Sequence, residues 1–146
     1  MKKVGIMSMQ RIANYGSFLQ AYALKQLIEE LGYKVEFVDY HVGASVVENN
    51  TESKNKIIRK LKKGMEAIKY KAPLSHKLSF IRYKQSFTQK YMSFLGVSDK
   101  MNYNPILDCL VIGSDEVFNC IQKNSNVGYS TELFGKDNRA TRLITY

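Results

Sequence analysis

Residues 4–40 read VGIMSMQRIANYGSFLQAYALKQLIEELGYKVEFVDY, and the spacing of apolar residues in this stretch decides the fold class. The apolar run at 3–7 predicts a short buried strand, and residues 17–31 predict a helix of about four turns. Residues 33–41 alternate β-branched or aromatic side chains with others, which predicts a second strand. A strand, a helix and a strand in this order favour a right-handed crossover that joins two parallel strands.

The helix has a predicted inner face and a predicted C-terminal end. Leu24, Leu27, Ile28 and Leu31 recur at helical spacing, so we expect them to face the sheet. Gly32 follows directly, and glycine is the residue that most readily adopts the positive φ at which many helices end.

The turn before the helix allows a structural and a functional interpretation. Ser17 and Gln20 have the S-x-x-Q spacing of a capping box, which predicts that the helix begins at Ser17. Asn14 is a common turn residue, Gly16 permits positive φ or a close approach, and Tyr15 adds a large amphipathic side chain. Ligands of open parallel sheets bind beyond the carboxyl ends of the strands, so this turn is a candidate binding site. It is a weak phosphate loop, because it lacks both G-x-G-x-x-G and G-K-[ST].

The rest of the chain continues the α/β pattern around a basic middle segment. Apolar residues at helical spacing predict helices over 57–68 and 78–96. The run CLVIGSD at 109–115 predicts a strand buried on both faces, as in a parallel sheet. A short helical turn is expected over 115–120, and RLITY at 142–146 predicts another strand. The sequence therefore predicts an α/β fold with a Rossmann-like parallel sheet and flanking helices.

The length and the charge distribution of the chain predict one domain with a basic helical insertion. The 146 residues fit a single domain over 1–146, with the globular composition of 45% hydrophobic and 24% charged residues. Residues 54–92 hold twelve Lys or Arg and one acid, whereas each flank carries a net charge of −1, so we interpret 54–95 as a basic helical insertion. Because the sequence stops inside the strand at 142–146, we expect the chain to be a truncated first part of a longer protein. The alternative is an edge strand that ends the domain.

Composition also narrows the partners and cofactors. No apolar run approaches the roughly 20 residues that cross a bilayer, and the N-terminus lacks a secretory signal, which favours the cytoplasm. A solvated face is the simplest interpretation of the basic helices; peripheral contact with the inner membrane face is the alternative, and no nucleic-acid partner is expected. Cys109, Cys120, His41 and His76 form no zinc pattern, so we expect neither a metal nor a cofactor.

A second candidate site follows the strand that ends near residue 112. Its residues are Gly113, Ser114 and Asp115, and either Ser114 or Asp115 is an N-cap in the structural interpretation. In the functional interpretation, Asp115 faces the same crevice as the first turn and accepts hydrogen bonds from substrate hydroxyls. A helix N-terminus stabilises an ionised carboxylate, which makes Asp115 a good acceptor and a weak base.

The two sites together resemble the polysaccharide pyruvyl transferase family. The opening stretch is similar to that family's first strand and its N-Y-G-x-x-L-Q-A-Y-A-L helix. DCLVIGSDEVFN at 108–119 is similar to the second motif, D-x-x-I-x-G-S-D-Q-V-W-N, and the two motifs are in order and in register over nearly the whole chain. The matching residues are Asn14, Tyr15, Gly16 and Gln20 in the first motif, and Gly113, Ser114, Asp115 and Asn119 in the second.

The resemblance implies the N-terminal half of a GT-B-type transferase, in which two Rossmann-like domains face a cleft. Family members transfer a pyruvyl group from phosphoenolpyruvate to two sugar hydroxyls as a ketal, in cell-surface polysaccharide biosynthesis. It implies that this half binds the sugar or polysaccharide acceptor through the matching residues, with Asp115 as the catalytic group. Arg and His residues of a C-terminal half, which this sequence lacks, are implied to hold phosphoenolpyruvate. We therefore expect no transferase activity from the 146-residue chain alone.

Two departures and two alternative functions accompany this resemblance. Glu116 replaces the family's Gln and Phe118 replaces its Trp, so this acceptor site gains a charge and loses an indole N–H donor. The first alternative is a non-catalytic module that binds a glycan or an anion. A flavodoxin-like nucleotide binder is disfavoured, because its first loop would need several phosphate-binding hydroxyls or glycines.

Overall fold

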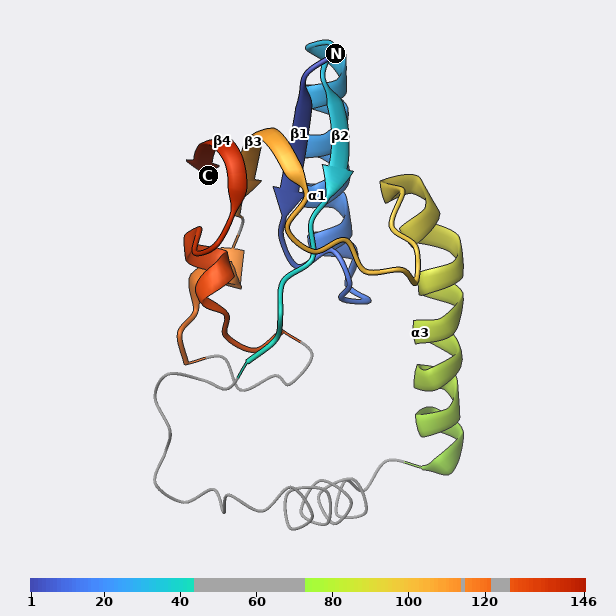
Figure 1. The fold of residues 1–146 in the computed structure, drawn as a ribbon. Coiled ribbons are helices and arrows are strands. Elements are labelled where there is room, and N and C mark those ends of the chain that lie inside the picture. The colour runs from blue at the N-terminus through green and yellow to red at the C-terminus, as the bar shows by residue number, and fades with distance from the viewer. Residues whose placement is uncertain (44–72, 114, 122–126) are drawn as a thin grey trace.

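A computed structural model describes residues 1–43, 73–113, 115–121 and 127–146 (Figure 1). Four strands and two helices form its regular structure, and two short 3₁₀ helices join the last two strands. They are β1 (Lys3–Met7), α1 (Tyr15–Glu30), β2 (Lys34–Phe37), α3 (Leu74–Leu95), β3 (Ile106–Ile112), η1 (Asp115–Phe118), η2 (Thr131–Phe134) and β4 (Arg139–Thr145). The helix expected over 57–68 lies outside the described residues.

The strands form one parallel sheet in the order β2-β1-β3-β4. Val4 of β1 pairs with Val35 on one side and with Cys109 on the other, so β1 and β3 are the two central strands. Leu110 of β3 pairs with Leu143 of β4 at the far side. The parallel α/β sheet expected from the sequence is therefore confirmed, including the strands near residues 3, 34, 109 and 142.

Two apolar layers cover the two faces of the sheet. On one face, α1 and the C-terminal half of α3 pack against β1 and β2; the buried residues there are Ile6, Phe18, Ala21, Phe37, Phe87, Met92 and Leu95. On the other face, η1 and η2 pack against β1 and β3; the buried residues there are Met7, Val38, Leu107, Leu110, Ile112, Val117 and Leu133. The two layers explain why β3 reads as an almost continuous apolar run.

The packing face of α1 differs from the one expected. Leu27 and Leu31 are 60% and 74% exposed, whereas Phe18 and Ala21 are buried. The expected inner face was therefore wrong for these two leucines. Phe18 fills the space above β1, and Ala21, one turn later, lets the helix approach the sheet closely; their direction turns Leu27 away from the sheet.

Helix α3 ends as expected but packs over only part of its length. Gly96 ends it in the left-handed conformation (φ 74°), and the Gly96 N–H donates to the Ser93 carbonyl at 3.0 Å. Leu78 and Ile81 continue the apolar helical spacing that leads to Phe87, yet both are exposed, whereas Phe87 is buried. Figure 1 gives the reason: α3 continues beyond the carboxyl edge of the sheet, and its N-terminal end lies farthest from it.

Candidate functional site at the carboxyl edge of the sheet

The ends of β1 and β3 form the point where the chain connections diverge. After β1 the chain passes through α1 to β2 on one side of the sheet, and after β3 it passes through η1 and η2 to β4 on the other. The Gly113 N–H donates to the Met7 carbonyl at 3.2 Å, which joins the two strand ends directly. Open parallel sheets bind ligands at such a switch point, and both sequence motifs begin there.

Asn14, not Ser17, caps α1. The Asn14 side-chain oxygen accepts from the N–H of Gly16 at 2.7 Å and of Ser17 at 3.3 Å, and α1 begins at Tyr15. The predicted start at Ser17 was therefore wrong by two residues, because an asparagine in extended conformation already ends the preceding turn. Ser17 lies inside the first turn, and Gln20 follows in the second.

This cap also decides what the turn can bind. The Phe18 N–H donates to the Asn14 carbonyl at 3.0 Å, and the Asn14 N–H donates to the Ile12 carbonyl at 2.8 Å. The N–H groups of Gly16 and Ser17 are taken by the Asn14 side chain, so the helix start offers no open cradle of amides to a phosphate. A hydroxyl-bearing neutral ligand fits this turn better than an anion does.

Tyr15 is fixed by α3 while half of its side chain remains exposed. Its ring lies 5.1 Å from the ring of Phe87 and 5.4 Å from that of Tyr91, both edge-on, and 6.2 Å from that of Tyr83. The neighbouring Tyr91 phenol raises the pKa of the Tyr15 phenol, so this hydroxyl is protonated at neutral pH. With 49% exposure, Tyr15 presents a positioned ring and hydroxyl to solvent.

The second motif is described in part. Gly113 lies directly against Tyr146. A side chain has no room at this position, since a Cβ on Gly113 would lie 2.6 Å from the Tyr146 ring and 2.7 Å from the Tyr146 carbonyl oxygen. The Asn119 side-chain oxygen accepts from the Ile121 N–H at 3.1 Å, which makes a local turn. Ser114 lies outside the described residues, and for Asp115 only the backbone, as the first residue of η1, is described.

Phe118 is the aromatic residue of η1. Its ring meets that of Phe134 edge-on at 5.6 Å, and it packs at the margin of the second core layer. The short helical turn expected over 115–120 is confirmed as η1. Phe118 thus joins η1 to η2 through apolar contact and donates no side-chain hydrogen bond to a ligand.

A buried ionic network next to this site was missed by the sequence analysis. The Asp39 carboxylate accepts from Arg11 Nε at 2.6 Å and Nη2 at 2.8 Å, from Gln10 Nε2 at 3.1 Å and from the Asn102 N–H at 2.9 Å. Gln10 in turn accepts from the Ser8 N–H at 3.0 Å. The network ties the loop after β1 to the end of β2 and to the segment that precedes β3.

Burial and hydrogen bonding have opposite effects on the pKa of Asp39. Burial alone would raise the pKa of its carboxyl, but the hydrogen bonds from Arg11, Asn102 and Gln10 outweigh burial and hold that pKa below its usual value. The hydrogen bond to Asp39 likewise raises the pKa of Arg11. Both groups are therefore charged at neutral pH. The network holds the candidate site in shape and leaves Asp39 no free lone pair for catalysis.

The only sequence signal for this network is weak. Gln10 and Arg11 follow β1, and Asp39 follows β2, so polar residues sit directly after two apolar strands.

His41, another polar residue after β2, pairs with Glu132 at 2.7 Å and stacks on Tyr103 at 4.1 Å between ring centres. These contacts join the segment after β2 to η2 and to the segment before β3.

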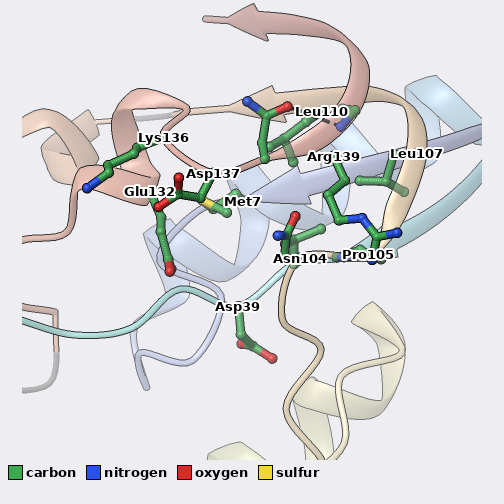
Figure 2. Close-up of a pocket in the computed structure, with 13 residues that line it drawn as sticks. Met7, Asp39, Asn104, Pro105, Leu107, Leu110, Glu132, Lys136, Asp137 and Arg139 are labelled. Carbon is green, nitrogen blue, oxygen red and sulfur yellow. Dashed lines mark hydrogen bonds between the residues drawn. The ribbon is translucent and has the colours of Figure 1, made fainter.

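Two cavities are each lined in part by Asp39. The one in Figure 2 has about 30 Å³, enough for one or two waters, and its floor of Met7, Leu107 and Leu110 is ringed by charged side chains. A larger groove of about 240 Å³ runs along the outer edge of β2, lined by Arg11 and Lys25 among others. None of the described candidate residues Asn14, Tyr15, Gly16, Gln20, Gly113 and Asn119 lines either cavity.

Among the described residues no cluster of His, Cys, Asp and Glu could hold a metal ion, and no disulfide joins Cys109 to Cys120. In the same part of the chain, neither helix has the length and apolarity to cross a membrane. No family model, curated protein or solved structure matches the chain.

Proposed function

We propose that this chain is the acceptor-binding half of a polysaccharide pyruvyl transferase-like enzyme, with the Rossmann-like domain of a GT-B architecture. The observation that carries the proposal is that the two motif segments leave adjacent central strands at one switch point, joined through Gly113 and Met7. The motifs are about a hundred residues apart in sequence, so this proximity is a property of the fold.

The hydrogen bonds of the first turn favour binding of the sugar acceptor over binding of the phosphoenolpyruvate donor. Asn14 already satisfies the first amides of α1, which leaves little for the phosphate or carboxylate of phosphoenolpyruvate to bind. Tyr15 offers a half-exposed ring and a protonated hydroxyl, which suit a sugar with one apolar face and several hydroxyls. Phosphoenolpyruvate is assigned to a second Rossmann-like half.

Asp115 is the proposed catalytic group. It begins η1 directly beyond the end of β3, on the side of the sheet where ligands of such folds bind. Its carboxylate would accept the proton, or a hydrogen bond, from the attacking sugar hydroxyl. Proton abstraction by an aspartate becomes efficient when its surroundings raise the pKa, and a bound sugar that excludes water would do so.

Sugar binding by the chain tests the acceptor assignment. Saturation-transfer NMR with methyl glycosides of galactose, mannose and N-acetylglucosamine should identify at least one bound glycoside. Tyr15→Phe removes only the hydroxyl and should weaken that binding about fivefold, the value of one lost hydrogen bond. Tyr33→Phe is the matched control, since Tyr33 is also partly exposed but lies past the C-terminal end of α1. Equal behaviour of the two variants, or no bound glycoside, refutes the acceptor site.

Activity tests the enzyme assignment separately. The product of the complete open reading frame should form a sugar pyruvate ketal from phosphoenolpyruvate, and Asp115→Asn should abolish this activity. The 146-residue chain alone should form none. Glycan binding without ketal formation by the complete product would instead identify a non-catalytic glycan-binding module.

A further inference from the structure

The N-terminal half of α3 is an exposed helix that combines apolar side chains with positive charge. Leu78 and Ile81 are 56% and 52% exposed, and Phe80 is 56% exposed. The residues of α3 that pack against the first core layer lie at Tyr83 and beyond, so the two turns before Tyr83 have no core to cover. In Figure 1 this part of α3 stands clear of the sheet.

The charge of α3 has one sign. Its 22 residues include Lys77, Arg82, Lys84 and Lys90 and no Asp or Glu. The sequence on its N-terminal side continues this bias, since residues 54–92 carry twelve basic residues and one acid. A solvated helix without a partner usually mixes both signs of charge, because pairs four residues apart stabilise it. This helix does not contain one such pair.

The cations lie on both sides of the apolar stripe. At about 3.6 residues per turn, Leu78 and Ile81 share one face of α3, with Lys77 on one flank and Arg82 on the other. Tyr83 lies nearly opposite this stripe, on the side that packs toward Tyr15. The Lys84 ammonium lies 4.9 Å from the centre of the Phe80 ring, so an aromatic side chain and a cation are already paired at the same end. An apolar stripe flanked by cations is typical of a helix that lies in a membrane interface.

We propose that residues 77–84 of α3 dock this protein onto an anionic phospholipid surface. The apolar stripe enters the headgroup region, while Lys77, Arg82 and Lys84 extend their charges to lipid phosphates. Charge complementarity selects this occupant, because an anionic bilayer supplies both an apolar layer and a dense negative surface. Leu19 and Leu27 are also exposed, but their helix, α1, does not carry positive charge alone, because Glu29 and Glu30 lie on it. The inference is independent of the sugar site.

Vesicle flotation with the whole chain tests the proposal. The protein should bind phosphatidylcholine vesicles that contain phosphatidylglycerol, and should bind pure phosphatidylcholine vesicles far more weakly. Added salt should release it, because screening shortens the reach of the charges. Each of Lys77→Gln and Arg82→Gln should reduce the partition coefficient about fivefold.

Paired apolar variants locate the contact. Leu78→Ser with Ile81→Ser should reduce binding roughly tenfold or more, through loss of buried apolar area. Leu19→Ser with Leu27→Ser is the matched control and should bind as the wild type does. All four residues are exposed, so circular dichroism and the unfolding midpoint should be unchanged in both variants. Equal binding to neutral vesicles, an unchanged Leu78/Ile81 variant, or binding to single-stranded RNA without vesicle binding overturns the proposal.

Discussion

The ion pair between Asp39 and Arg11 gives the sharpest quantitative prediction. The side chains are 7% and 31% exposed, and Asp39 accepts four hydrogen bonds at 2.6–3.1 Å. Removal of one partner of a buried pair costs about 3–5 kcal/mol, and the partial exposure of Arg11 favours the lower end. We therefore expect Asp39→Asn to reduce the free energy of unfolding by about 3 kcal/mol.

A double-mutant cycle separates the pair from its surroundings. Urea unfolding followed by circular dichroism would compare wild type, Asp39→Asn, Arg11→Met and the double variant. The expected coupling is about 2 kcal/mol at neutral pH. The pair four residues apart on α1, between Lys25 and Glu29 at 2.7 Å, is the control, with an expected coupling of about 0.3–0.5 kcal/mol.

Acid provides a second test of the same pair. Because folding lowers the pKa of Asp39, its stabilisation is complete above the pKa of an unfolded aspartate, about 3.9, and is lost as the pH falls through the folded pKa. The coupling should therefore decline below about pH 4. A coupling no larger than that of the control pair, or one that persists unchanged in strong acid, would refute the reasoning.

Three further substitutions test the helix start, the core and the sheet by urea unfolding. Asn14→Ala should lower the free energy of unfolding by about 1 kcal/mol and Ser17→Ala by a few tenths. A larger loss for Ser17→Ala than for Asn14→Ala would instead identify Ser17 as the N-cap. Phe87→Ala should cost about 3–5 kcal/mol, whereas Phe94→Ala, at an exposed position, should cost about 0.5 kcal/mol or less; equal costs would contradict the packing of α3. Gly5→Ala should cost about 1–3 kcal/mol, because its Cβ would lie 2.4 Å from a leucine methyl on β3, and a neutral result would contradict that contact.

The strands and helix ends could be predicted because their signals are local. The apolar runs at β1 and β3 and the glycines at 32 and 96 each act within a few residues, and the structure has the expected elements at each place. The start of α1 was also a local question with two candidate caps. Asn14 prevails because its side chain reaches two amides of the first turn.

The packed faces and the ionic network required information that the sequence pattern does not contain. Leu27 has the same spacing as a core residue, and only the position of Phe18 over the sheet turns it outward. Gln10, Arg11, Asp39 and Asn102 come from three separate segments, with separations of 28 to 63 residues between bonded partners. Their meeting depends on the order and register of the strands, which no local pattern specifies.

The central strand pair has a consequence for how the protein is made. The Lys3 N–H bonds the Asp108 carboxylate across 105 residues, and β1 pairs with β3 along the same line. On the ribosome, β1, α1 and β2 can associate early, but the second edge of β1 stays unpaired until β3 has been synthesised. Contacts so distant in sequence slow folding, and an open strand edge invites association with other chains. Translation that stops before residue 106 should therefore give an aggregation-prone product.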